Sequence, residues 1–166
     1  MRWQLPTTFL LSALSATPAL AGQQVQAVWS GSTFSTAGPS GENVFVAGFS
    51  LIGENGEQIY NEAYPDGYNP CIYAGQEFQL EGGCLGGAWY SFRCQANQIG
   101  VPQQCEVMGP EGNSVGTGDG NDNTDFFGLG ISISGTCRVQ FELVDGIECG
   151  EDSGDLSPHD TAWGGF

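Results

Sequence analysis

The chain has 166 residues, of which 19 are acidic and three are basic, and its formal net charge is −16. A field this negative repels nucleic-acid phosphates and anionic lipids, so the composition argues against nucleic acid and a membrane as partners. It keeps a protein soluble and attracts cations or basic proteins.

The first 21 residues have the organisation of a secretory signal peptide. Arg2 precedes an apolar stretch, 9–21, which ends in Ala-Leu-Ala and so places small residues at the −3 and −1 positions of a cleavage site. The stretch is too short, and too often interrupted by Ser, Thr and Pro, to span a bilayer. We therefore expect cleavage after Ala21 and secretion. This leaves two arginines, no lysine and 19 acidic residues, a net charge of −17.

The mature part has the pattern of short strands separated by turns. Residues 43–52 are apolar on both faces, which is typical of a central strand, and the Asn55-Gly56 turn that follows predicts a hairpin. Pro65-Asp66-Gly67 predicts a further turn, because Pro fixes φ and Gly supplies a positive φ. The other strands are expected at 23–29, 57–64, 71–80, 88–94 and 105–108, with loops at 30–42, 95–104 and 110–125.

The clearest pattern runs from residue 126 to residue 144. Apolar residues occupy every second position on both sides of Gly135-Thr136, which predicts a half-buried strand, a tight turn and a second half-buried strand. No helix of any length is indicated. The sequence thus predicts an all-β fold, a small antiparallel β-sandwich or barrel over residues 22–149, followed by an acidic disordered tail at 150–166.

All six cysteines fall in the mature part. An even number in a small secreted protein predicts three disulfides, and the absence of any Cys-x-x-Cys spacing argues against a metal site built from them. Many pairings are open to six cysteines. We expect the sequence-local set, which is Cys71–Cys84, Cys94–Cys105 and Cys137–Cys149.

Segment 119–125 places oxygen-bearing side chains at every second residue. A tight loop with that spacing can wrap a hard cation, so four residues are candidate Ca²⁺ ligands: Asp119, Asn121, Asn123 and Asp125. The segment is not an EF-hand, because Thr124 and Gly130 stand where that loop has Gly and Glu. A plain solvated turn is the alternative, since the same residue types favour turns.

Aromatic residues near a turn form a second candidate site. Tyr64, Asp66 and Tyr68 surround the Pro-Asp-Gly turn and are expected to be exposed. Together with Trp89 they can form a surface that stacks on sugars or contacts a protein. Packing in the core is the alternative explanation for these aromatic residues.

Catalytic motifs are weak. Four carboxylates in or beside strands are the candidates for a glycosidase pair, although outward-facing strand acids explain them as well: Glu77, Glu81, Glu106 and Glu142. His159 is the only histidine and falls in the expected tail, and paired cysteines leave no free thiol. We therefore expect a protein that is not an enzyme.

The signal peptide, the six cysteines from Cys71 to Cys149, the small all-β pattern and the lack of a catalytic motif together resemble the small secreted cysteine-rich proteins of fungi. Many proteins of that class are effectors that act on a plant host. The resemblance implies an extracellular, effector-like interaction protein with a role in virulence. We expect it to bind a host protein or a cell-wall glycan without a cofactor. The alternative is a small carbohydrate-active module, either a Ca²⁺-assisted lectin-like binder or a glycosidase with paired carboxylates.

Overall fold

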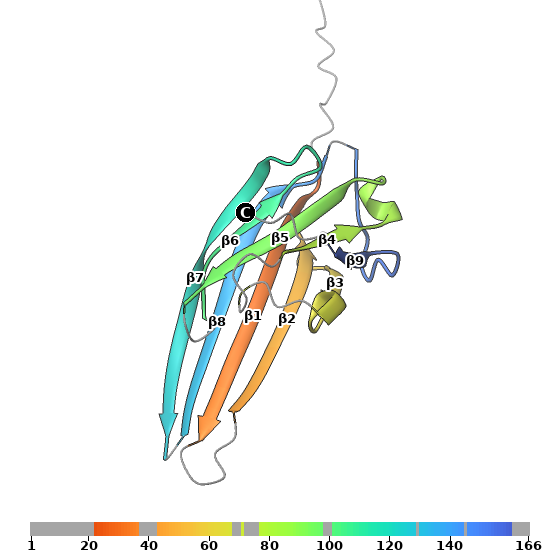
Figure 1. Ribbon diagram of the computed structural model, residues 1–166. Coiled ribbons are helices and arrows are strands. Elements are labelled where there is room, and N and C mark those ends of the chain that lie inside the picture. The colour runs from red at the N-terminus through yellow and green to blue at the C-terminus, as the bar shows by residue number, and fades with distance from the viewer. Residues whose placement is uncertain are drawn as a thin grey trace, which may run out of the picture.

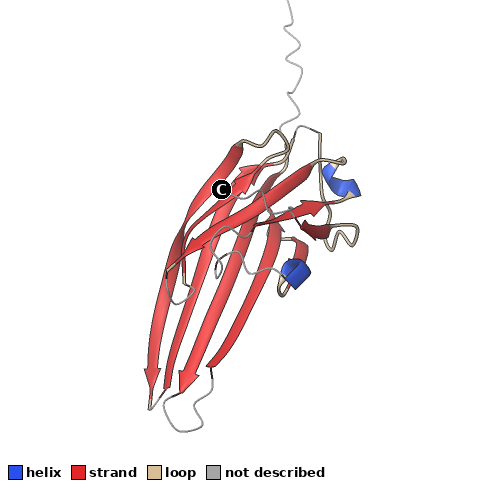
Figure 2. Cartoon of the chain, viewed as in Figure 1, coloured by secondary structure: helices blue, strands red, loops and turns tan. Residues whose placement is uncertain are grey.

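The computed structural model describes residues 22–36, 43–67, 71, 77–97, 101–128, 130–144 and 146–160. The predicted signal peptide lies outside these residues. The strands are β1 (Gln24–Thr36), β2 (Asn43–Gly53), β3 (Gln58–Glu62), β4 (Glu77–Glu81), β5 (Trp89–Ala96), β6 (Pro102–Met108), β7 (Ser114–Phe127), β8 (Gly130–Glu142) and β9 (Ser157–Asp160). Two single-turn 3₁₀ helices, η1 (Pro65–Gly67) and η2 (Gly83–Leu85), complete the described elements (Figure 2). Within the described residues no helix has the length and apolar character needed to cross a membrane.

The all-β prediction is confirmed. The nine strands form one antiparallel sheet in the order β3-β2-β1-β8-β7-β6-β5-β4-β9, curled into a half-barrel (Figure 1). At the broad end of the molecule the two halves of the curled sheet face each other, and we call this end the sandwich. The first half of the sheet is β3, β2, β1 and β8, and the second half is β6, β5, β4 and β9.

Strand β7 is the corner where the sheet curls. Its first part pairs with β6 as far as Asp119, and its second part, from Gly120, pairs with β8. A Cβ at Gly116 or Gly118 would lie 2.5 Å or 1.9 Å from a carbonyl oxygen of β8, so a side chain at either position would displace the backbone. Glycine therefore lets β7 pass close over its neighbour at the bend.

The core of the sandwich is a cluster of aromatic rings. The ring of Phe49 in β2 lies 4.8 Å from that of Phe78 and 5.1 Å from that of Phe92, both on the opposite half of the sheet. Trp29 in β1 stacks on Phe92 at 6.2 Å. All four side chains are buried, so the two halves of the sheet are joined mainly by apolar contact.

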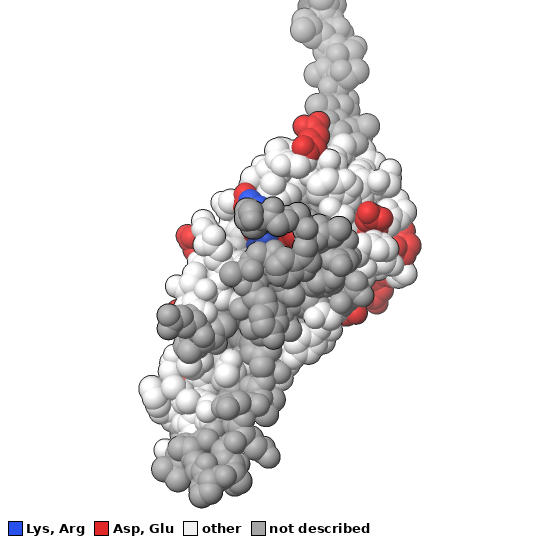
Figure 3. All heavy atoms as spheres, in the orientation of Figure 1, with Lys and Arg blue, Asp and Glu red and all other residues white. Residues whose placement is uncertain are grey.

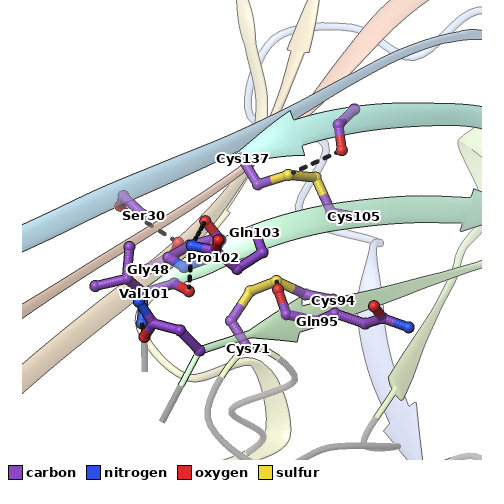
Figure 4. The surroundings of a disulfide bond; sticks show 12 residues. Ser30, Gly48, Cys71, Cys94, Gln95, Val101, Pro102, Gln103, Cys105 and Cys137 are labelled. Atoms are coloured by element: carbon purple, nitrogen blue, oxygen red, sulfur yellow. Dashed lines mark hydrogen bonds between the residues drawn. A yellow bond between two sulfur atoms is a disulfide. The ribbon is translucent and has the colours of Figure 1, made fainter. Parts of the chain in front are cut away.

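All six cysteines are paired, which confirms the prediction of three disulfides, but the expected pairing is wrong. The bonds are Cys71–Cys94, Cys84–Cys149 and Cys105–Cys137. The bend at β7 carries β6 over β8, so Cys105 meets Cys137 across the two halves of the sheet rather than a cysteine close by in sequence (Figure 4).

The expected disordered tail is wrong over residues 150–160. The backbone N–H groups of Asp152 and Ser153 donate to the carbonyl oxygens of Gln58 and Ile59 in β3, at 2.8 and 2.9 Å. The chain then turns and adds β9 beside β4. This segment therefore connects β3 with β4 and supplies β9, the last strand of the sheet, and the Cys84–Cys149 bond fixes its start. Residues 161–166 lie outside the described part.

Two expected loops and one expected turn are also wrong. The predicted loop at 30–42 is strand β1 as far as Thr36, and most of the predicted loop at 110–125 is strand β7. Gly135 lies inside the continuous strand β8, and the hairpin closes where Phe127 of β7 pairs with Gly130 of β8. Gly135 is required for packing, because a Cβ there would lie 2.7 Å from Cδ of Pro102. The turns at Asn55-Gly56 and Pro65–Gly67 are confirmed, with φ values of 85° at Gly56 and 78° at Gly67.

Candidate binding surface

Four strands continue beyond the sandwich as a narrow sheet (Figure 1). This sheet, which we call the extension, consists of residues 30–36 of β1, 43–48 of β2, 121–127 of β7 and 130–136 of β8. It follows the same register as the sandwich, but β6 ends its pairing with β7 at Asp119, before the extension begins. On the face that Figure 3 shows, the acidic side chains gather around the broad end. The extension also carries exposed carboxylates, those of Asp122 and Asp125 in β7.

The outer face of the extension is lined by small polar side chains. Because side chains alternate along a strand and Trp29, Phe49 and Cys137 point into the core, the even-numbered residues of β1, β2 and β8 point outward. They border a shallow groove of about 310 Å³. The groove is lined by Ser30, Gly31, Ser32, Val46, Ala47, Gly48, Ser134, Gly135 and Thr136. The hydroxyl of Ser30 donates to the carbonyl oxygen of Gly48 at 3.4 Å (Figure 4).

The candidate Ca²⁺ ligands lie in strand β7 rather than in a loop. Asp119, Asn121, Asn123 and Asp125 are all exposed. Alternate residues of an extended strand are spaced roughly 6.5–7 Å apart, so these side chains form a row and do not surround one point. The amide of Asn123 donates to the carboxylate of Asp125 at 2.8 Å. In the part of the chain that the structure describes, no group of three or more His, Cys, Asp or Glu side chains could hold a metal ion. The Ca²⁺ site therefore stays a prediction, and the segment on which it was based is a strand and not a loop.

The predicted aromatic surface is divided between the two halves of the sheet. Tyr64 is half-buried against the core, and its hydroxyl accepts a hydrogen bond from the backbone N–H of Ala47 at 3.3 Å. Trp89, also half-buried, begins β5 and pairs with Glu81 of β4. The side chain of Asp66 and all of Tyr68 lie outside the described residues. Tyr64 therefore contacts the edge of β2, and its hydroxyl group is hydrogen-bonded within the protein.

The contacts that the structure gives for the candidate catalytic carboxylates are contacts that support the fold. Two N–H groups of Arg93 donate to one oxygen of Glu106, at 2.6 and 2.8 Å. A hydrogen bond from the Ser114 side chain, followed by the hydrogen bond and charge of Arg93, lowers the pKa of Glu106 although its partial burial opposes this. A general acid needs the opposite shift. Glu81 lies 3.8 Å from the His159 ring nitrogen, across the β4–β9 pair, and Glu142 is exposed.

Sequence reasoning missed the groove residues Ser30 and Ser32, because the Ser, Thr and Gly content of 30–36 indicates a loop. The signal that could have found them is the alternation that continues from Trp29 through Gly31 and Thr33. Comparisons of the chain with protein families, with curated proteins and with solved structures found no match.

Proposed function

We propose that this protein is a secreted, non-enzymatic interaction protein that binds a host or cell-wall component in the extracellular space. The three disulfides are compatible with an extracellular location, in agreement with the predicted signal peptide. The observation that carries the proposal is the extension, a sheet that runs past the sandwich and is not needed to enclose the core. Surfaces carried on a rigid scaffold in this way are where binding functions concentrate.

The chemistry of the extension suits a partner that makes both polar and apolar contacts, because Val46 in the groove is 57% exposed. Its outer face offers the hydroxyls of Ser32, Ser134 and Thr136 and the amide of Asn121, which both donate and accept hydrogen bonds. On the inner face near the tip, where Phe126 pairs with Ile131, the ring of Phe126 is 79% exposed. A large exposed aromatic ring among polar groups is typical of an anchor residue in a protein interface.

A carbohydrate-binding module is the second candidate, and the groove is the observation that favours it. Hydroxyl and amide groups along a shallow depression match the hydrogen-bonding groups of a glycan. A glycan array probed with and without Ca²⁺ separates the two functions. Glycan binding that requires Ca²⁺ supports the lectin-like alternative, and no retained glycan supports a protein partner.

The test is retention of the mature protein by host extracellular fluid and by isolated cell walls. The double variant Ser32→Arg and Ser134→Arg places two large side chains on a cross-strand pair in the groove. The matched control is Gln26→Arg and Gln140→Arg, a cross-strand pair on the same strands and the same face, outside the groove. We expect the groove variant to lose retention and the control to keep it. Equal retention of both, or a hydrolase activity abolished by one carboxylate substitution, would refute the proposal.

A further inference from the structure

The margin of the extension formed by β7 has no neighbouring strand. Strand β6 pairs with β7 from Ser114 to Asp119, and among the described residues no strand lies beside β7 after that point. In Figure 1 the lower half of β7 forms the outer border of the extension. Residues 121–126 are all exposed. This stretch therefore presents an open strand edge.

The register shows which backbone groups are unpaired. The N–H of Leu143 donates to the carbonyl oxygen of Gln23, so the odd-numbered residues of β8 direct their backbone groups toward β1. Its even-numbered residues, such as Thr136 and Ser134, consequently face β7, where they pair with Asn121 and Asn123. The backbone N–H and C=O groups of the alternate residues of β7 must then point away from β8, toward the open edge. These residues are Asp122, Thr124 and Phe126.

A second contact confirms this alternation. On the opposite margin of the extension, the same pattern directs the N–H of Ala47 away from β1. That N–H does point outward, and it donates to the Tyr64 hydroxyl. The fold thus covers this outward group of β2 with a side chain, and it connects β3 with β4 through residues 150–160. The described residues supply no corresponding cover for β7.

This edge of β7 is open because β6 does not pair with β7 beyond Asp119. Pro102 begins β6, and proline has no N–H to give to a ladder. The Pro102 carbonyl oxygen lies 1.9 Å from where a Cβ of Gly120 would stand, and its ring lies 2.7 Å from the corresponding point of Gly135. The start of β6 therefore crosses over the inner face of the sheet at two glycines and does not continue alongside β7.

We propose that this open edge of β7 accepts an extended segment of another protein, rich in Lys or Arg, as an added β-strand. The inference rests on the proposed function and names its partner class. Three residues offer both N–H and C=O groups to an incoming strand. Two exposed carboxylates lie within the same stretch, one on Asp122, which is among the three, and one on Asp125. A basic strand complements these charges. A second copy of this edge would oppose acid with acid, and the chain has no lysine to relieve the repulsion.

The probe is a synthetic eight-residue peptide in which Lys and Val alternate. Two matched peptides serve as controls: one with Glu in place of Lys, and one with the Lys/Val sequence but N-methylated at every residue, so that neither edge of the peptide can donate. The N-methylated peptide keeps the charge and loses the donors that a strand ladder needs. Binding is measured by fluorescence anisotropy, and backbone amide exchange in the protein is measured by NMR. We expect only the unmodified Lys/Val peptide to bind.

The exchange pattern identifies the mode of binding. In the free protein the amides of Asn121 and Asn123 should be protected by β8, whereas those of Asp122, Thr124 and Phe126 should exchange freely. The Lys/Val peptide should protect this second set. Peptide binding without protection of these three amides, or equal binding of the N-methylated peptide, would show charge attraction alone and overturn the proposal.

Variants separate the edge from the general acidity of the protein. Thr124→Pro removes one outward N–H and should weaken the peptide at least about tenfold, whereas Thr124→Val keeps the N–H and should bind like the wild type. Where Thr124→Pro fails to fold, Asp122→Asn with Asp125→Asn gives the second test, and weaker binding is again expected. Unchanged peptide binding in folded variants refutes the inference. The inference is also refuted if the free protein forms a dimer that Thr124→Pro dissociates, because the edge would then pair with a second copy of the chain.

Failure here is distinguishable from failure of the proposed function. If the groove variant still loses partner retention while the edge variants do not, the interaction function stands and the added-strand mode falls. If neither set of variants changes retention, both fall.

Discussion

The sandwich and the extension share strands β1, β2, β7 and β8, yet they differ in what covers the inner face of those strands. In the sandwich, the inner positions of β1, β2 and β8 hold Trp29, Phe49 and Val139, which are buried against the other half of the sheet. In the extension, the inner positions of the same strands hold residues such as Thr33 and Ile133, a cross-strand pair that is only half-buried. The core therefore ends where the other half of the sheet no longer covers these strands, although apolar residues continue along β8.

This difference assigns stability and binding to separate regions. The sandwich contains the aromatic cluster and all three disulfides, and the extension is held mainly by backbone pairing with strands that the sandwich anchors. Regions with few buried apolar contacts open locally more easily than a core does. Substitutions in the extension should accordingly alter binding with little loss of global stability, and three measurements test this contrast.

The largest contrast is expected between two phenylalanines. Phe49 is 1% exposed in the sandwich, and Phe126 is 79% exposed in the extension. Phe49→Ala should lower the free energy of unfolding by about 3–5 kcal/mol, because it leaves a cavity among aromatic rings. Phe126→Ala should change it by less than about 0.5 kcal/mol, as for other exposed sites. Urea denaturation measures both, and similar losses would show that the extension belongs to the core.

The next effect concerns the bridge between β3 and β4. The Cys84–Cys149 bond closes a loop of 65 residues. Replacing both cysteines with Ser should cost about 4 kcal/mol, because a long loop is freed in the unfolded chain. Since β1 and β8 run without interruption through both regions, amide protection in the extension should fall together with that in the sandwich. Hydrogen exchange at Asn123 and Val139 checks this, and retained protection at Asn123 alone would make the extension an independent unit.

The smallest effect depends on pH. Because the Ser114 hydrogen bond and Arg93 lower the folded-state pKa of Glu106 below its ordinary value of 4.5, the folded form favours the ionised carboxylate. That stabilisation is present above the ordinary value and is lost as pH falls through the lower, folded-state pKa. The Arg93 side chain is 43% exposed, so solvent limits the effect to at most about 1 kcal/mol.

The measurement compares the wild type with Glu106→Gln in urea at pH 7 and at successively lower pH. The wild type should be more stable at pH 7, and the difference should shrink once the pH is below 4.5. Glu142→Gln, an exposed change in the sandwich strand β8, controls for the loss of one negative charge. A difference that is constant with pH would mean that the ion pair does not stabilise the fold.

Strand identity was predictable wherever alternation was strong. The all-β fold, the Asn55-Gly56 hairpin and the β5 strand follow from side-chain period and turn chemistry. The error at Gly135 is instructive, because the odd-numbered apolar residues keep the same phase from Ile131 to Phe141. A turn at Gly135 would have joined two strands, whereas one unbroken phase describes a single strand with a packing glycine.

The other errors arise where tertiary contacts override local preference. The residues of 114–125 favour a turn by composition, yet pairing with β6 on one side and β8 on the other makes them a strand. Cys94 and Cys105 do lie opposite each other in the β5–β6 ladder, as the local pairing implies, but each bonds to a different cysteine. The candidate binding surface combines 30–36 with 121–136, which only the sheet order brings together.

The bridge at the end of the chain has a consequence for biogenesis. Gln23, at the start of β1, exchanges hydrogen bonds with Cys149, although 126 residues separate them in sequence. During translation the first strand is therefore made long before its partner β8, and contacts between such distant residues slow folding. The bond between Cys84 and Cys149 can form only after the 65 residues that follow Cys84 have been synthesised. A chain that terminated before Cys149 would leave Cys84 without its partner and would expose the edges of β3 and β4 to pairing with other chains.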